Sequence, residues 1–562
     1  MTDKRPASEL VSQRHLFPPT SDAQKIVPLS ILDCTTVRFA LTCGVSSLIL
    51  ASPTRADLFS QTWIYDPPTS DTAIRAADPQ HLQTSLEHTL SSYPQWAGQL
   101  FWNSYDPTNS QGHTHRHGRI AIKYGAGQAG DEPGVGFFVV KLPVPVTMLV
   151  PSPAERATME NGAWSIDQQL PSRALLSPEV VAFQDNVTHL GKPGVSIQVT
   201  QFADGGYAIG IKICHALADA ASLVTFMHDW AKVNRAMAAN DVLPTLTPVF
   251  DPSLLDKCAS GSIDASSSDM NIVERARKLP MHRYDWFLSG GPSCPPPLLP
   301  FTRPAPDLDI SQDAVHVRGI PIPWHEWDTR VPVKHVILHF SAAEIRAMHA
   351  RASADGEQRL SKLDALLAHV WACILRARQL DEDETAFLDI TFGFRPRLGL
   401  PPTFLGSPIR LTAVETTANT ITNARTALPH LARHIRGTLD RFIPSACADI
   451  LHDLAHEPTA QNIWATFLGR RHTLMTSWTK LGLYGVDFAG EGRAPRYVDA
   501  MMPPSDGLLQ ISESAPEDGK VLDGKAQAAG ADWTRDGASV SLHLRMDVME
   551  RLFAHPMLRA FA

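Results

Sequence analysis

A predicted β-hairpin that leads directly into a helix constrains the fold of this chain more than any other feature. Two apolar segments, residues 196–202 and 207–213, flank Ala-Asp-Gly-Gly, a sequence typical of a hairpin turn. Apolar residues at helical spacing then predict an amphipathic helix from about residue 220. The connection, Cys-His-Ala-Leu-Ala-Asp-Ala over residues 214–220, therefore joins a strand end to a helix start, where side chains project into clefts.

His215 and Asp219 are the candidate functional residues of this connection. An imidazole with an unperturbed pKa near ~6.5 is largely neutral at neutral pH and can accept a proton as a general base. Asp219 stands at the predicted helix N-terminus, where an anion is favoured. On this pattern alone, a buried histidine followed by a helix-capping aspartate is the more common explanation.

The remaining pattern predicts an α/β fold with mixed sheets. Leucines at 82, 86 and 90 predict a helix that Pro94 stops, and residues 361–378 predict another. Ser341 and Glu344 form a capping box at the start of a third helix. Further strands are predicted at residues 119–124, 136–144, 333–340, 388–394 and 540–546. Because strands and helices do not alternate strictly, a doubly wound nucleotide-binding core is not indicated.

The length of 562 residues predicts more than one domain. We expect an N-terminal arm over 1–27, a first domain over 28–255 and a second domain over 333–562. Residues 256–332 are rich in serine and proline, and we interpret them as an insertion and crossover between the two halves.

Charge and cysteine content exclude several classes of protein. The formal net charge is −8 and no basic stripe is present, so nucleic acid is not an expected partner. Seven scattered cysteines without CxxC spacing argue against a disulfide framework or a structural zinc site and fit a reducing compartment. The apolar run at residues 39–50 is too short to span a bilayer. We expect a soluble, cytoplasmic monomer.

Two other patterns have a structural explanation. Residues 125–130 match GxGxxG, but Asp-Glu-Pro-Gly and a predicted strand follow where a dinucleotide site needs a helix, so we expect a hairpin loop that binds no nicotinamide cofactor. His113, His115 and His117 alternate like metal ligands on a strand, but their polar surroundings predict a solvated loop. GxSxG, Walker A and HExxH motifs are absent from the sequence.

Five segments, in order along the chain, resemble the motifs of the BAHD acyltransferases, in particular their fungal branch. The second matches the HxxxD motif of the family at His215 and Asp219. The segments are LQTSLEHTLSSYPQWAGQL (82–100), HALADA (215–220), SKLDALLAHVWACILRAR (361–378), DITFGFRPRLGLPPTFLGSP (389–408) and TSWTKLGLYGVDFAGEG (476–492). HxxxD alone is not specific, but the five together are.

The resemblance implies two similar-sized domains of mixed β-sheet with flanking helices, as in chloramphenicol acetyltransferase, and an active-site tunnel between them. It implies that His215 is the general base and that Asp219 has a structural role, paired with Arg395 rather than Arg397. Thr476, Ser477 and Trp478 resemble the segment that lines the reaction centre. An acyl-coenzyme A is the implied cosubstrate, with no metal and no bound cofactor, and the acceptor is a small alcohol or amine of secondary metabolism.

Three positions depart from the family pattern. Ala220 replaces a glycine, and Ser407 replaces an asparagine. The DFGWG motif has become a longer segment that keeps Asp487, Phe488 and Gly492 but lacks the tryptophan. This departure leaves open a related enzyme that takes its acyl group from a carrier protein, as condensation domains do. A non-catalytic binding protein on this fold is a further alternative, opposed by the intact His215 and Asp219.

Overall fold

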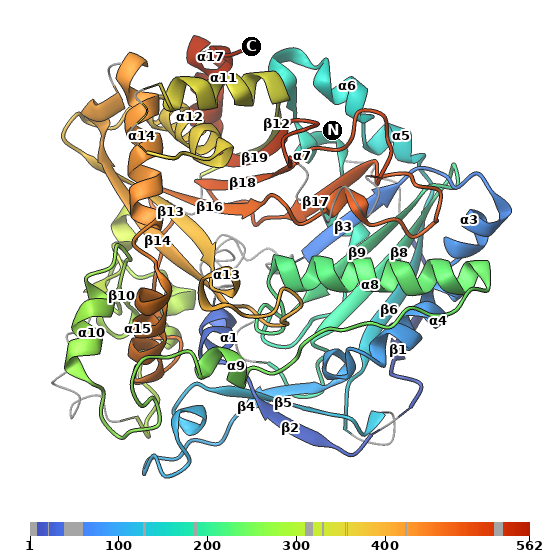
Figure 1. Cartoon of the computed structure of the whole chain (residues 1–562), viewed down its shortest axis with the longest axis horizontal. Coiled ribbons are helices and arrows are strands. Elements are labelled where there is room, and N and C mark those ends of the chain that lie inside the picture. The colour runs from blue at the N-terminus through green and yellow to red at the C-terminus, as the bar shows by residue number, and fades with distance from the viewer. Residues whose placement is uncertain are drawn as a thin grey trace.

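Two mixed β-sheets organise the computed structural model, as the sequence predicted (Figure 1). It describes residues 8–20, 22–38, 60–127, 131–184, 188–308, 319–328, 331–354, 356, 358–421, 424–521 and 532–562. The first sheet has the order β1 (Glu9–Leu16), β6 (Val135–Leu142), β8 (Val195–Phe202), β9 (Tyr207–Ile213), β3 (Ser60–Tyr65), β17 (Tyr497–Met501). The second has the order β14 (Ile409–Thr417), β13 (Thr385–Gly393), β16 (His472–Trp478), β18 (Leu508–Glu513), β19 (Ala538–Arg545), β12 (Val333–Phe340), β7 (Ala163–Trp164).

The predicted hairpin lies in the middle of the first sheet. β8 and β9 pair antiparallel with continuous register from Val195–Ile213 to Gln201–Tyr207. Helices α4 (Pro79–Leu90) and α8 (Ala220–Ala239) pack against each other and cover this sheet. Alternate strand residues such as Trp63, Ile197 and Ile209 are buried in one hydrophobic cluster with the apolar faces of these helices. This burial places the end of β9 and the start of α8 in a fixed position.

The second sheet is covered by α11 (Ala342–Ala352), α12 (Lys362–Arg378), α14 (Ala424–Leu439) and α17 (Met546–Ala554) (Figure 1). α12 is the central one, since all but four of its residues are buried. β13, β16 and β18 run parallel to one another, so the carboxyl ends of these strands meet at one edge of the sheet. That edge carries the segments after Gly393 and Trp478 that resemble family motifs.

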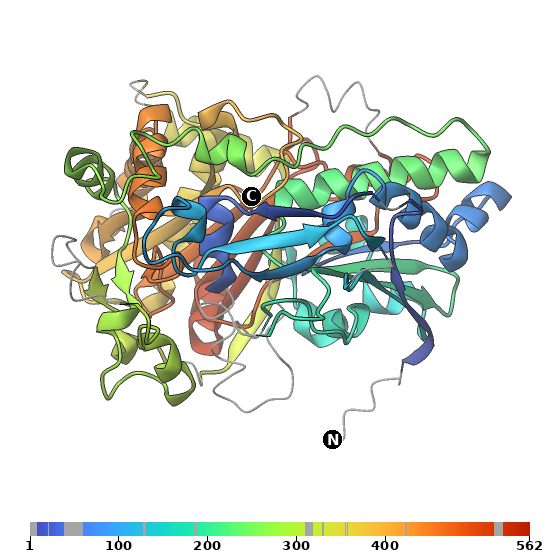
Figure 2. The ribbon, with the colours of Figure 1, turned by 90° about the horizontal axis from the view of Figure 1, so that it is seen from below.

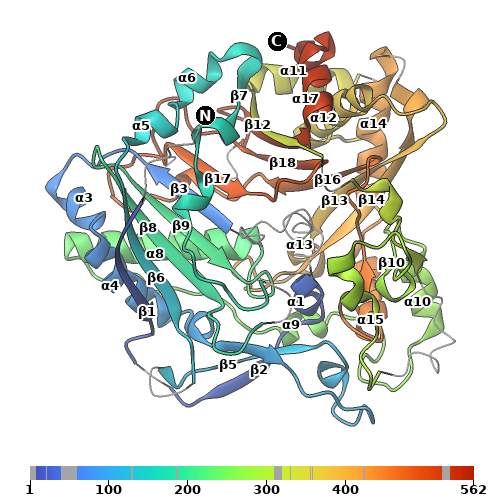
Figure 3. The same cartoon turned by 180° about the vertical axis from the view of Figure 1, so that it is seen from behind.

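The two halves exchange strands, which the division at residue 333 did not predict. β17 belongs to the second half by sequence, but it pairs with β3 in the first sheet from Tyr497–Ile64 to Met501–Ser60 (Figure 3). In return β7, from the first half, pairs with β12. Strand pairing depends on backbone hydrogen bonds, and the side-chain pattern of a short strand does not reveal its partner. The halves are therefore two interlocked sheets.

The predicted N-terminal arm over residues 1–27 is wrong where the structure describes it. β1 pairs with β6 as the edge of the first sheet. β2 (Lys25–Pro28) pairs with β5 (Ile120–Tyr124) in a small sheet completed by β4 (Gln99–Trp102), which faces the viewer in Figure 2. The side chains of β1 are almost all exposed, so its sequence has the polarity of an arm although its backbone is bonded.

The crossover segment packs tightly on the second half. Its helix α10 (Met270–Arg277) lies against α15 (Pro444–Ala455), and three arginines form ion pairs with acidic residues of or beside α15. Arg275 pairs with Asp449, and Arg277 and Arg283 each pair with both Asp453 and Glu457. The serine- and proline-rich composition therefore reflects an irregular but packed segment.

The apolar run at residues 39–50 lies outside the described residues. Of the helices that the structure describes, none has both the length and the apolar character to cross a bilayer.

The capping box of α11 gives a stability prediction with a matched control. The Ser341 hydroxyl accepts a hydrogen bond from the Glu344 backbone N–H at 3.2 Å, and the Glu344 carboxylate accepts one from the Ser341 N–H at 2.7 Å. Replacing Ser341 by alanine is expected to lower the free energy of unfolding by about 1 kcal/mol. The Ser353 hydroxyl at the other end of α11 is buried and makes no hydrogen bond to the described residues. Ser353→Ala should therefore be neutral or stabilising in the same urea titration; an equal loss in both variants would contradict the assignment.

Candidate active site

The connection between β9 and α8 presents His215 at the end of a buried strand. Asp219 is the N-cap of α8, and its Oδ1 accepts a hydrogen bond from the Ser222 backbone N–H at 2.9 Å. The predicted helix start is therefore confirmed. The Asp219 backbone N–H donates to the carbonyl of Gly406 in the second half at 3.0 Å. The short loop that carries His215 is thus bonded at its end to the other half of the chain.

Asp219 forms a buried ion pair with Arg395, the first residue of the short helix α13 (Arg395–Leu398). Both residues are less than one-tenth exposed. Arg395 donates from both terminal nitrogens to the two carboxylate oxygens, and also to the Ser222 hydroxyl at 2.7 Å. Arg397 instead donates to backbone carbonyls of Phe442 and Gly393. The geometry agrees with the choice of Arg395 over Arg397 and gives a bidentate, charge-assisted contact.

Ser407 lies directly beside the imidazole of His215. Its hydroxyl oxygen is 2.9 Å from His215 Nδ1, and it occupies the position where the family pattern has an asparagine. A neutral imidazole that donates from Nδ1 to this oxygen carries its basic lone pair on Nε2. Ser407 therefore fixes the orientation of the ring from the second half of the chain.

Asp33 supports Ser407 from a third segment, and sequence reasoning missed it. It lies in the short helix α1 (Ile31–Thr35), and its Oδ1 accepts a hydrogen bond from the Ser407 backbone N–H at 2.6 Å. Its Oδ2 accepts from the Ser30 hydroxyl at 2.6 Å and from the Ser30 N–H at 3.1 Å. Burial raises the pKa of Asp33 to about 7. The available signal was the capping box formed by Ser30 and Asp33.

Burial also decides the protonation state of His215. It lowers the pKa of the imidazole below its ordinary value of 6.5, and the nearby Asp219 carboxylate opposes this shift only in part. The ring is therefore neutral at neutral pH and can accept a proton.

Thr476, Ser477 and Trp478 are the last three residues of β16. Since β16 is parallel to β13, they lie at the same sheet edge from which the chain continues to Arg395. Trp478 is buried in the hydrophobic cluster of the first half, so it packs across the junction between the halves. The Ser477 hydroxyl is 3.0 Å from that of Thr479. Contact of these residues with a reacting group stays a prediction.

The altered DFGWG segment packs on the first half. Asp487 accepts hydrogen bonds from the N–H groups of Gly490 at 2.8 Å and Gly492 at 3.0 Å, which closes the longer loop. Phe488 is fully buried and packs edge-on against Trp230 of α8 at 4.8 Å between ring centroids. These contacts are those of a segment that supports the fold.

The expectation of a solvated histidine loop is wrong for His113. Its side chain is only 12% exposed, and its ring nitrogens lie 2.7 Å from Asp264 and 3.1 Å from Asp256. Both partners come from the crossover segment, whose packing the sequence did not reveal. In the GxGxxG segment, Glu132 accepts hydrogen bonds from the N–H groups of Ala126 and Gly127, and β6 follows. Residues 128–130 of that motif lie outside the described residues.

A cavity of about 1140 Å³ is lined by both halves of the chain. Leu142 and Ser172 contribute from the first half, and His335 and Asp499 from the second. Met501 in the lining pairs with Ser60, which in turn pairs with Lys212, three residues before His215. Two strand spacings of about 4.8 Å each separate Met501 from Lys212. Met501 therefore brings one side of the lining to the end of the sheet from which the histidine loop leaves, although His215 is not among the residues that line the cavity.

The fold and this site define an acyltransferase of two interlocked α/β halves with an HxxxD motif at the junction. The model of a family described as "Transferase family" matches residues 170–278 and 304–521, more than half of the chain. The chain belongs to this family, the BAHD acyltransferases.

Relatives and solved structures agree with this assignment. The chain is 28% identical to "Acyltransferase AFT15-1" of Alternaria alternata over 89% of this chain and 91% of that protein. It is 25% identical to rosmarinate synthase of Plectranthus scutellarioides over 64% of this chain and 69% of that enzyme. TRI101 of F. graminearum, solved with coenzyme A and deoxynivalenol, has the same fold, with a TM-score of 0.62 at 16% identity over 95% of this chain and 98% of that one.

The ion pair between Asp219 and Arg395 gives a prediction on stability and activity together. Either Asp219→Ala or Arg395→Ala leaves a buried charge without its partner and should cost about 3–5 kcal/mol of unfolding free energy. The double variant should lose less than the sum of the single losses, because the second change strands no charge.

Thermal melting and denaturant titration of the four proteins measure this coupling. Arg397→Ala with Asp219→Ala is the matched control pair, and its losses should add. Strictly additive losses for Asp219 and Arg395 would contradict the coupling. An Asp219→Ala protein with unchanged melting but no turnover would make Asp219 a direct participant in catalysis.

Proposed function

We propose that this enzyme transfers an acyl group from a coenzyme A thioester to a hydroxyl or amine of a small molecule, with His215 as the general base. The observation that carries the proposal is the partly buried imidazole of His215 at the junction of the two halves, with Nδ1 2.9 Å from the Ser407 hydroxyl and with a pKa that desolvation lowers. Such a ring can take a proton from an acceptor that is a poor nucleophile at neutral pH.

The reaction needs no covalent enzyme intermediate. His215 Nε2 removes the proton of the acceptor hydroxyl while the oxygen attacks the thioester carbonyl. The tetrahedral oxyanion collapses, the carbon–sulfur bond breaks, and the histidine returns the proton to the thiolate. The products are an ester and free coenzyme A. Because the donor is already activated, positioning both substrates at one base supplies much of the rate.

The other site residues have distinct proposed roles. Asp219 and Arg395 keep the histidine loop in place and act through structure. Thr476 and Ser477, at the end of β16, are the proposed source of a hydroxyl or N–H group that stabilises the oxyanion. Asp487, Phe488 and Gly492 support the fold of the first half.

The proposal includes an acyl-coenzyme A as the donor and a role of the enzyme in secondary metabolism. The support for the donor is that TRI101, which shares the fold, was solved with coenzyme A. The support for the context is the similarity to fungal acyltransferases such as that of Alternaria alternata. The cavity of about 1140 Å³ is large enough for a bulky acceptor.

Incubating the purified enzyme with acetyl coenzyme A and a panel of alcohols and amines tests the proposal. We expect free thiol and acylated product to form together. Mass spectrometry of the products of a host that expresses the wild-type enzyme, compared with a host that expresses His215→Ala, would then identify the acceptor. Transfer from an acyl carrier protein but from no free acyl-coenzyme A would overturn the proposed donor.

Replacing His215 by alanine should lower kcat by about 10²- to 10⁴-fold with little change in melting temperature or coenzyme A binding. In the wild-type enzyme, kcat should fall as the pH drops through a pKa below 6.5, because burial lowers this pKa and protonation removes the base. His325→Ala, at an exposed position, is the control. Activity of His215→Ala within about threefold of wild type would exclude the general-base role.

Ser407→Ala should lower kcat by up to about tenfold through loss of one hydrogen bond to His215, with a smaller effect on KM and a shifted acid limb of the pH profile. Ser407→Asn should recover much of this loss, since an amide can also bond Nδ1 and asparagine is the family residue here. A wild-type pH profile in Ser407→Ala would show that Ser407 does not position the base.

A further inference from the structure

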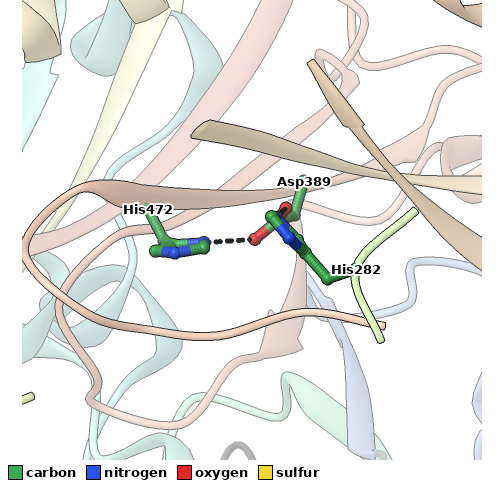
Figure 4. A group of neighbouring side chains, drawn as sticks. All are labelled: His282, Asp389 and His472. Carbon is green, nitrogen blue, oxygen red and sulfur yellow. Dashed lines mark hydrogen bonds and ion pairs between the residues drawn. The ribbon is translucent and has the colours of Figure 1, made fainter. Parts of the chain in front are cut away.

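Three side chains from distant segments meet in the second half, away from the histidine loop. His282 comes from the crossover segment, Asp389 from β13 and His472 from the start of β16 (Figure 4). His282 Nε2 lies 3.1 Å from Asp389 Oδ1, and His472 Nδ1 lies 3.0 Å from Asp389 Oδ2. One potential ligand atom from each residue lies within 4.8 Å of the others.

Two imidazoles and one carboxylate form a donor set that suits zinc. Zinc binds nitrogen and oxygen at about 2.0–2.2 Å, so two ligand atoms of one ion lie roughly 3–4 Å apart. The separations of 3.0 Å and 3.1 Å to the Asp389 oxygens fall in this range. The facing nitrogens of the two imidazoles lie within 4.8 Å of each other as well.

His282 Nε2 and Asp389 Oδ1 face each other as an ion pair at 3.1 Å, but their contact does not have the geometry of a hydrogen bond. His282 Nε2 and Asp389 Oδ1 are buried, and neither makes a hydrogen bond to any part of the chain that the structure describes. The His282 side chain is 10% exposed, and Asp389 is fully buried. A buried contact between an imidazole and a carboxylate that is poorly aligned for a hydrogen bond is one that an ion held between the two groups would improve.

The surrounding groups match the shell that orients metal ligands. The Thr466 hydroxyl donates a hydrogen bond to Asp389 Oδ2 at 2.8 Å. The Tyr284 hydroxyl lies 3.4 Å from His472 Nε2, the ring nitrogen that points away from Asp389. A histidine that binds a metal through Nδ1 carries its proton on Nε2 and donates it to a neighbour, as Tyr284 permits.

We propose that His282, Asp389 and His472 bind one zinc ion, which fastens the crossover segment to the second sheet. His472 precedes Thr476 by four residues on β16, which is about 13 Å along the strand. At this distance from the reacting groups, the ion would stabilise the fold and take no part in acyl transfer. The sequence predicted no metal site because the three residues are far apart along the chain. Asp389 and His472, the two that are nearest in sequence, are separated by 83 residues.

The zinc content of the purified enzyme tests this proposal directly. Full-length enzyme is stripped with a chelator, incubated with Zn²⁺, desalted and analysed by mass spectrometry for metals. We expect about one zinc per chain and a higher melting temperature with Zn²⁺ but not with Mg²⁺. His282→Gln should weaken zinc binding at least about tenfold, whereas the exposed His325→Gln should bind like wild type.

Wild-type enzyme that takes up less than about 0.1 zinc per chain would overturn the proposal, as would unchanged binding in His282→Gln. X-ray absorption spectroscopy of the zinc-loaded wild-type enzyme identifies the zinc ligands without any variant, so the test holds even if a variant fails to fold. It should show two imidazole ligands and no sulfur; a sulfur ligand would place the ion at cysteines and contradict the site. These readouts do not depend on acyl transfer, so they fail or succeed separately from the proposed function.

Discussion

The buried ion pair between Asp219 and Arg395 is the interaction on which the arrangement of the site depends. Asp219 belongs to the loop that follows β9, and Arg395 to the helix that follows β13, so the pair connects the carboxyl ends of strands from the two sheets. Arg395 also bonds Ser222 and the carbonyl of Gly406. The residue after Gly406 is Ser407, which contacts His215. One guanidinium therefore fixes both the loop that carries the histidine and the loop that orients it.

Two features of its surroundings prepare His215 to act as a base. Burial lowers its pKa and keeps the ring neutral, while the hydrogen bond that Nδ1 donates to the Ser407 oxygen keeps the ring in one orientation. Asp33 adds a hydrogen bond to the backbone of Ser407, so three segments converge behind the imidazole. The exchange of β17 and β7 between the sheets makes separation of the halves costly, because it would break strand pairing on both sides. The proposed chemistry thus rests on a rigid junction.

Much of the site could be predicted because the hairpin, the helix start and the choice of Arg395 depend on local patterns and family motifs. The pairing of β1 at a sheet edge and the exchange of β17 could not be predicted, since backbone pairing leaves little trace in side-chain polarity. Asp33 was missed because a capping box signals only a helix, and its contact with Ser407 spans 374 residues. His113 was assigned to solvent because its partners Asp256 and Asp264 lie in the irregular crossover segment.

We propose the imidazole of His215 as the base of the reaction. Histidine-selective ¹⁵N labelling and NMR titration measure the pKa of His215 itself, assigned with the His215→Ala spectrum. Single-turnover acyl transfer measures the pKa of the group that must be unprotonated. We predict that the two values agree and lie below 6.5, with Nδ1 protonated in the neutral ring. A His215 pKa that differs clearly from the kinetic value would show that another group takes the proton and would contradict the general-base role of His215.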